Sequence, residues 1–132
     1  MSEPVDAVPS TACDALAWFI QQCIVKPRRP RWRRILIEAP GTLAGEMHKF
    51  ERDVDAERCT ALDRWPFETS RTPRELATRG AYSEGGTCET LSLQSALARL
   101  TPMQHDAVFV ALDRSFATFF HHEGRVWRFP RQ

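Results

Sequence analysis

Cationic side chains concentrate in one short segment. Six of the nine residues from Lys26 to Arg34 are Lys or Arg, and none is acidic. Arginines closely spaced on an extended chain can contact successive phosphates, and Trp32 could stack on a base or pack beneath a guanidinium. The same arginines could dock on an acidic protein, or pair with the acidic face expected over residues 46–57 of the same chain. The segment therefore indicates an anionic partner, either outside the molecule or within it.

Few other residues have types and spacing that indicate catalysis. Cys88 and His105 could form a dyad only if the fold brings them together, because their spacing matches no nucleophile motif. The sequence also lacks a nucleophile elbow, a phosphate-binding loop and a paired-carboxylate signature. We therefore expect a protein that is not an enzyme and needs no cofactor, with a small enzyme using Cys88 or His105 as the third hypothesis.

His121, His122 and Glu123 are side-chain types that bind metals. Neighbouring residues on a regular strand point to opposite faces, so both histidines cannot reach one ion from a strand. We therefore expect no metal site here.

Large aromatic residues beside arginines are typical of the centre of protein interfaces. The expected partner-binding residues come from the basic segment and the C-terminal strand: Arg28, Arg29, Arg31, Trp32, Arg33, Arg34, Arg125, Trp127 and Arg128. The first hypothesis is a non-enzymatic binding protein of bacterial, phage or mobile-element type. It would act by stoichiometric protein–protein contact, as inhibitors, immunity proteins and adaptors do.

The alternative is a nucleic-acid-binding accessory or regulatory protein that uses the basic arm, residues 26–34. A nucleic-acid binder should show a basic stripe that continues from the arm onto Arg125, Arg128 and Arg131. A protein inhibitor needs only an isolated basic patch with apolar neighbours. A homodimer is compatible with either hypothesis.

Composition limits the class of protein. The chain has 132 residues and a net charge of +1; without the basic arm, 12 Lys and Arg remain against 17 Asp and Glu, a net of −5. We expect a flexible leader over residues 1–10 and a single α+β domain over residues 11–132. Cys13, Cys23, Cys59 and Cys88 have no metal-site spacing, which favours reduced thiols in a cytoplasmic protein. The longest apolar run is too short to cross a membrane, so no membrane partner is expected.

Apolar periodicity and capping patterns predict the elements that would position these residues. About four helices are expected, drawn from segments 11–25, 43–54, 72–80, 93–100 and 102–112. Strands are expected at about 32–38, 115–122 and 125–129, in a small, mostly antiparallel three-stranded sheet. A two-residue turn at Glu123-Gly124 would place Phe120 opposite Trp127 and Thr118 opposite Phe129. This hairpin could pair within the chain or across a dimer.

Overall fold

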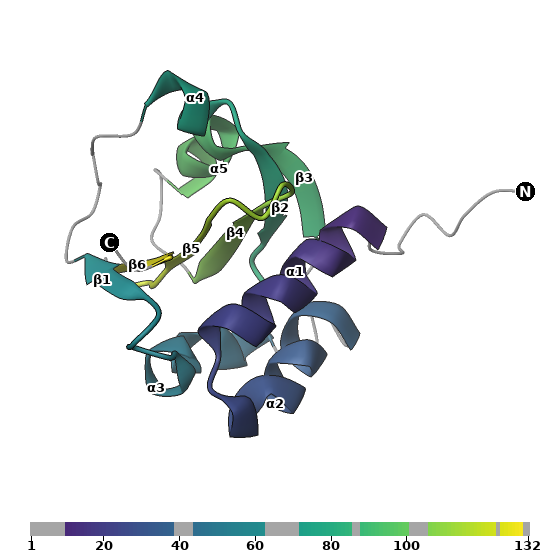
Figure 1. Ribbon diagram of the computed structural model, residues 1–132, viewed down its shortest axis with the longest axis vertical. Coiled ribbons are helices and arrows are strands. Elements are labelled where there is room, and N and C mark those ends of the chain that lie inside the picture. Colours follow the sequence, from purple (N-terminus) through teal and green to yellow (C-terminus); the bar gives the residue numbers. More distant parts are fainter. Residues whose placement is uncertain are drawn as a thin grey trace, which may run out of the picture.

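The computed structural model describes residues 10–38, 44–62, 72–85, 88–100, 106–123 and 125–130. In these residues the protein is an α+β domain with five α-helices and one six-stranded antiparallel sheet (Figure 1). The prediction of a three-stranded sheet on about four helices is therefore wrong. The strand order across the sheet is β1-β6-β5-β4-β2-β3.

The sheet is built from six short strands. They are β1 Thr60–Leu62, β2 Arg79–Ser83, β3 Cys88–Ser92, β4 Ala107–Ala111, β5 Ala117–Phe120 and β6 Val126–Phe129. Gly80, the last residue of the helical segment expected over residues 72–80, lies inside β2. The two edges of the sheet are β1 and β3.

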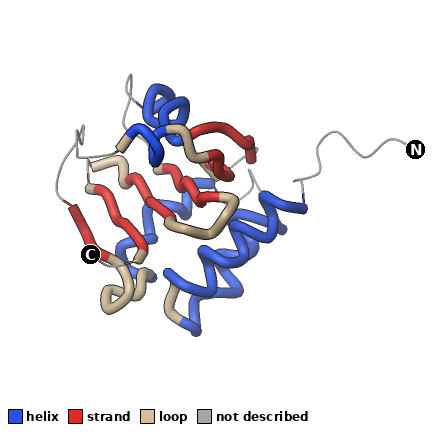
Figure 2. The backbone as a smooth tube through the Cα atoms, turned by 45° about the horizontal axis from the view of Figure 1, so that its top comes forward, coloured by secondary structure: helices blue, strands red, loops and turns tan. Residues whose placement is uncertain are grey.

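Helices lie on both sides of this sheet (Figure 2). The α-helices are α1 Ser10–Cys23, α2 Arg29–Arg33, α3 Phe50–Asp53, α4 Pro73–Leu76 and α5 Leu93–Leu100. The 3-10 turns are η1 Lys26–Arg28 and η3 Ala44–Lys49, and η2 Arg34–Glu38 is a π-helical turn. Thr72 begins α4 as predicted, because its Oγ1 accepts a hydrogen bond of 3.1 Å from the Glu75 amide.

The basic arm is helical, so the strand predicted over residues 32–38 is wrong. Pro27 and Pro30 lie in the first turns of η1 and α2, where a missing amide hydrogen breaks no helical hydrogen bond. The prolines therefore begin helical turns instead of forcing an extended chain. Trp32, Ile35 and Leu36 then recur at helical spacing and are fully buried.

Strand β4 explains why a helix was predicted over residues 102–112. All five of its residues are buried, because it is an inner strand covered on both faces. Val108 and Val110 pack in the core beneath α1, whereas Phe109 packs with α5 on the other face. A strand buried on both faces has no apolar–polar alternation, so periodicity alone cannot distinguish it from a helix.

The C-terminal hairpin forms within the chain, but its register differs from the prediction by one residue. Phe119 pairs with Trp127, and Phe120 pairs with Val126. The His121 amide donates to the Arg125 carbonyl at 2.8 Å, so His121 lies opposite Arg125, whereas a two-residue turn would put His122 there. Because a shift of one residue exchanges the two faces of a strand, Phe119 and Trp127 face α3, and Phe120 faces α5.

Among the described residues, no helix has both the length and the apolar character needed to cross a bilayer.

Candidate functional site: the basic face

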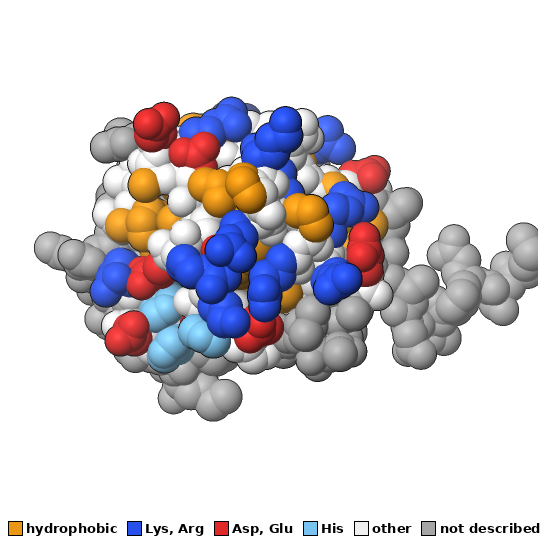
Figure 3. All heavy atoms as spheres, turned by 90° about the horizontal axis from the view of Figure 1, so that it is seen from below, with side chains coloured by type: hydrophobic (Ala, Val, Ile, Leu, Met, Phe, Trp, Pro, Cys, Tyr) orange, Lys and Arg blue, Asp and Glu red, His pale blue; other side chains and the backbone are white. Residues whose placement is uncertain are grey.

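Five cations and three carboxylates form one surface over η1, α2, η3, α3 and the residue before β6, which we call the basic face. Its members are Arg28, Arg31, Lys49, Arg52 and Arg125, with Glu46, Glu51 and Asp53. Figure 3 shows Lys and Arg side chains gathered on this side of the molecule, with His side chains next to them. The cations exceed the carboxylates by two, so the face is net positive.

Asp53 is the buried anchor of the basic face. Its carboxylate is fully buried and accepts hydrogen bonds from Arg52 Nε at 2.9 Å and from the Trp32 indole nitrogen at 2.9 Å. Arg28 Nε lies 3.7 Å from the same carboxylate. Burial would raise the pKa of Asp53, but the hydrogen bonds from Arg52 and Trp32, with the charges of Arg52 and Arg28, hold it below its usual value.

Glu46 holds a second pair of cations. Its Oε1 accepts from Arg31 at 2.7 Å and from Lys49 at 3.0 Å. The hydrogen bond from Lys49 is the main cause that keeps the pKa of Glu46 below its usual value, with a further contribution from Arg31. Two carboxylates therefore each hold two cations, and the surplus charge points outward.

Glu51 extends the face to the C-terminal hairpin. It accepts from Arg125 at 2.8 Å and from the Trp127 indole nitrogen at 2.9 Å. The side chains of Arg28 and Arg52 are 46% and 47% exposed, and that of Arg125 is 40% exposed. The cations are thus fixed in position by carboxylates beneath them and still reach solvent, an arrangement that suits an anionic partner.

The structure distributes the predicted binding residues unevenly. Arg28, Arg31 and Arg125 belong to the basic face. Arg29 is half-buried and donates to the Ile24 carbonyl, whereas Arg33 is exposed and pairs with Glu38. Arg34 is also exposed, in the turn that follows α2.

Trp32 and Arg128 do not contribute to the exposed basic face. Trp32 is fully buried, with its ring edge-on to Phe50 and Phe119, so it cannot stack on a base. Trp127 is half-buried, with its ring edge-on to Phe50. Arg128 points to the opposite side of the sheet from Trp127, where it pairs with Glu75. Arg131 lies outside the described residues.

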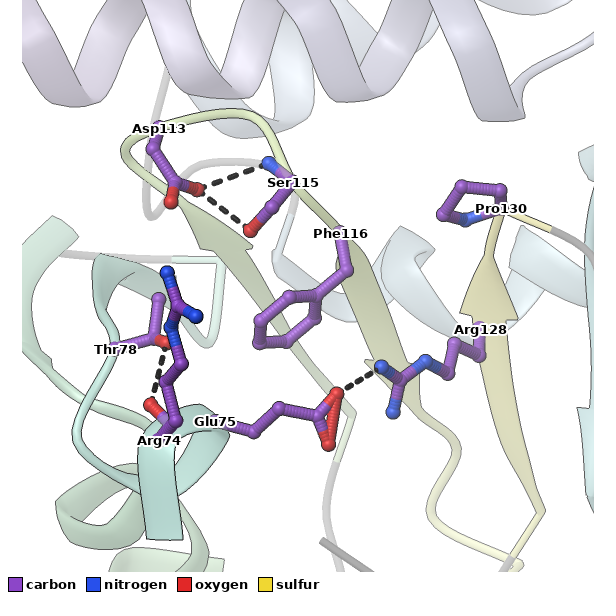
Figure 4. Close-up of a pocket in the computed structure, with 8 residues that line it drawn as sticks. All are labelled: Arg74, Glu75, Thr78, Asp113, Ser115, Phe116, Arg128 and Pro130. Carbon is purple, nitrogen blue, oxygen red and sulfur yellow. Dashed lines mark hydrogen bonds and ion pairs between the residues drawn. The ribbon is translucent and has the colours of Figure 1, made fainter. Parts of the chain in front are cut away.

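Arg128 instead lines a surface pocket of about 470 Å³ between α4 and the β4–β5 turn (Figure 4). The pocket holds charges of both signs, because Arg128 pairs with Glu75 and the charge of Arg74 acts on Asp113. The Ser115 hydroxyl donates to Asp113 at 2.6 Å, and the hydrogen bonds from Ser115 hold the pKa of Asp113 below its usual value.

Cys88 does not have the environment of a nucleophile. Burial, with smaller contributions from Cys13 and Glu89, raises the pKa of Cys88 to about 11. A nucleophilic thiol needs the opposite shift. His105 lies outside the described residues.

The structure also brings together two histidines that were not expected to share a metal ion, and an aspartate that was not predicted as a site residue. His121 and His122 lie just after the end of β5, and their ring centroids are 4.3 Å apart. Asp106, at the start of β4, accepts from His122 Nδ1 at 3.0 Å. The expectation that the two histidines diverge is wrong, because regular strand geometry ends at Phe120. A turn signal directly after the His-His pair was the available clue.

No protein-family model, curated protein or solved structure matches this chain.

Proposed function

We propose that the protein is a non-enzymatic binding protein that forms a stoichiometric complex with an acidic surface of another protein through the basic face. The observation that carries this proposal is the layering of charge, with carboxylates held beneath more exposed cations. Such fixed guanidinium groups lose little side-chain entropy on binding and can form bidentate contacts with carboxylates. An inhibitor, immunity protein or adaptor of bacterial, phage or mobile-element origin would act in this way.

The composition of the face favours a protein partner over nucleic acid. Glu46 and Glu51 are partly exposed within it and would repel a row of phosphates. The buried Trp32 provides no stacking platform. Arg128, on the opposite side of the sheet, does not continue the stripe that a nucleic-acid binder should show.

A cytoplasmic location fits the chemistry of the cysteines. Cys13, Cys23, Cys59 and Cys88 are all free thiols, and two of these thiols, those of Cys23 and Cys59, hydrogen-bond to each other without forming a disulfide. A reducing compartment keeps such pairs reduced, so we propose that the protein works in the cytoplasm.

The test is affinity capture with three baits: the wild type, a variant with Arg28, Arg31 and Arg52 changed to Ala, and a control with Arg79, Arg99 and Arg114 changed to Ala. The control removes three exposed arginines that lie outside the basic face. Each capture is run with and without nuclease, and a retained protein is then purified and titrated against each bait.

We expect an acidic protein that survives nuclease, binds the wild type and the control at a 1:1 ratio, and binds the basic-face variant much more weakly. Loss of all captured material on nuclease treatment would replace this proposal with the nucleic-acid alternative. Equal binding by the basic-face variant and the wild type would refute the role of the face.

A further inference from the structure

We propose that Asp106, His121 and His122 bind one divalent transition-metal ion of the Zn²⁺ type. Each residue offers one ligand atom, and the three atoms all lie within 4.8 Å of one another. The site lies at the end of the sheet where β4 begins and β5 ends, and it does not depend on the function proposed for the basic face.

The sheet register brings the three residues together. Ala107 pairs with Phe120 in the antiparallel β4–β5 ladder, so the next residues outward, Asp106 and His121, also lie opposite each other. The chain then turns at His122, whose amide donates to Asp106 Oδ1 at 2.9 Å. This turn puts both histidine rings on the same side as the aspartate, a placement that a continuing strand would forbid.

The distance between the Asp106 and His122 ligand atoms suits a shared metal ion. Ligand atoms bound at about 2.0–2.2 Å from one ion lie about 3 to 3.5 Å apart at right or tetrahedral angles. Asp106 Oδ1 and His122 Nδ1 are 3.0 Å apart. Two imidazoles with one carboxylate favour zinc and its transition-metal neighbours over Mg²⁺ and Ca²⁺, which prefer oxygen ligands.

Carboxylates also surround the buried member of the set. The His121 side chain is 5% exposed, with Glu51 Oε1 at 3.9 Å from its Nε2 and Glu123 Oε1 at 3.6 Å from its Nδ1. His121 Nδ1 also accepts a hydrogen bond from the Glu123 amide at 3.2 Å, so Nε2 is the nitrogen available to a metal ion and the backbone amide orients the ring. Glu123 is well exposed and can supply a further ligand.

His122 and Asp106 are more exposed than His121, so the remaining coordination positions face solvent. An ion can enter without unfolding the sheet, and water or a ligand from a partner can complete its coordination. Binding would join the start of β4 to the β5–β6 turn and stabilise that end of the sheet.

The experiment is calorimetric titration of the untagged, chelator-treated, reduced full chain with ZnCl₂. The two ligand variants are His122→Ala and Asp106→Asn; Asn keeps an oxygen that can accept from the His122 amide. The control is His48→Ala, because His48 is an exposed histidine on η3 whose ring contacts only the Gly45 carbonyl among the described hydrogen bonds. Circular dichroism checks that each variant folds.

We expect one Zn²⁺ per chain for the wild type and His48→Ala, with a rise in melting temperature on binding. Both ligand variants should lose about tenfold or more in affinity. Co²⁺ in the same site should give the visible spectrum of nitrogen and oxygen ligands, without the sulfur-to-metal band that Cys ligands produce.

Three results would overturn the proposal. The first is no binding by the wild type, which would leave Asp106 and His122 as a simple hydrogen-bonded pair. The second is unchanged affinity in folded His122→Ala. The third is a sulfur-to-metal band with Co²⁺, which would place the ion on the cysteines instead.

Discussion

Replacing Asp53 by Ala should destabilise the protein strongly, because this carboxylate connects the basic face to the core. It is fully buried and accepts from Arg52 and from the Trp32 indole. Trp32 is itself fully buried, with its ring edge-on to Phe50 and Phe119. In the variant, the indole N–H would lose its acceptor in a place that bulk water does not reach.

The expected loss in the free energy of unfolding is about 3 kcal/mol. A hydrogen bond to a charged acceptor contributes about 1.5–3 kcal/mol, and an unsatisfied buried donor costs a similar amount. Arg28 and Arg52 add little to this loss, because their side chains are about half exposed and water can solvate them. The main cost therefore comes from the Trp32–Asp53 contact.

Urea denaturation followed by tryptophan fluorescence would measure the loss. Asp53→Asn is the matched control, because its amide oxygen can still accept from Trp32, so it should lose clearly less than Asp53→Ala. Glu46→Ala should also lose less, since Glu46 is partly exposed and contacts only exposed or half-exposed cations among the described residues. If Asp53→Ala is no less stable than Glu46→Ala, the indole–carboxylate bond does not anchor the face.

The same carboxylate should make stability depend on pH. The pKa of Asp53 in the folded protein is below its ordinary value of 3.8, so folding favours the ionised form. Its contribution is complete above the unfolded pKa and is lost as the pH falls through the lower folded pKa. The stability difference between wild type and Asp53→Asn should therefore shrink below about pH 4; a constant difference at all acid pH values would contradict the assignment.

Two further predictions concern the core. Gly80→Ala should destabilise the protein by about 1–3 kcal/mol, because a Cβ there would lie 2.4 Å from the Phe109 ring. In urea denaturation, the double variant with Phe109→Leu should lose less stability than the sum of the two single variants. Additive losses would refute the contact. Oxidised glutathione should join Cys23 to Cys59, because their thiols hydrogen-bond to each other. Peptide mapping by mass spectrometry would detect this link, and Cys59→Ser is its control; a disulfide elsewhere would contradict the pairing.

Helical periodicity and capping residues predicted the helices well where one apolar face exists. The pattern Leu16, Phe19, Ile20, Cys23 follows from an amphipathic helix over one face of a sheet, and α1 forms there. Thr72 likewise predicted the start of α4. In these segments local chemistry and tertiary packing favour the same structure.

The sheet could not be predicted in the same way, because its inner strands pack on both faces. β4 contains no polar position that alternates with the apolar ones. The strand predicted over residues 32–38 is wrong for a related reason, because over so few residues Ile35 and Leu36 fit a strand and a helix equally well. The helical spacing becomes evident only when Trp32 is known to be buried with them. Long-range pairing decides both cases, and single-sequence patterns do not contain it.

The sequence predicted which residue types form the candidate site better than it predicted how they are arranged in space. The sequence shows the surplus of arginine in the basic arm, and it indicated that acids in residues 46–57 could pair with these arginines. In the structure, Glu46 pairs with Arg31 and Asp53 pairs with Arg28. Which arginines remain exposed depends on how α2 packs on α3. The histidine cluster depends on the residue at which β5 ends, and element boundaries are the least predictable feature of a sequence.

Glu51 connects the basic face with the proposed metal site. One of its oxygens accepts from Arg125 at 2.8 Å and lies 3.9 Å from His121 Nε2. A divalent ion bound by His121 would place two more positive charges beside the basic face, strengthening its attraction for an acidic partner. Because binding free energies are reciprocal, that partner must then strengthen metal binding by the same factor. Titrating the partner with and without Zn²⁺ should reveal this coupling in the wild type and its loss in His122→Ala, whereas two independent sites would show equal partner affinity in both conditions.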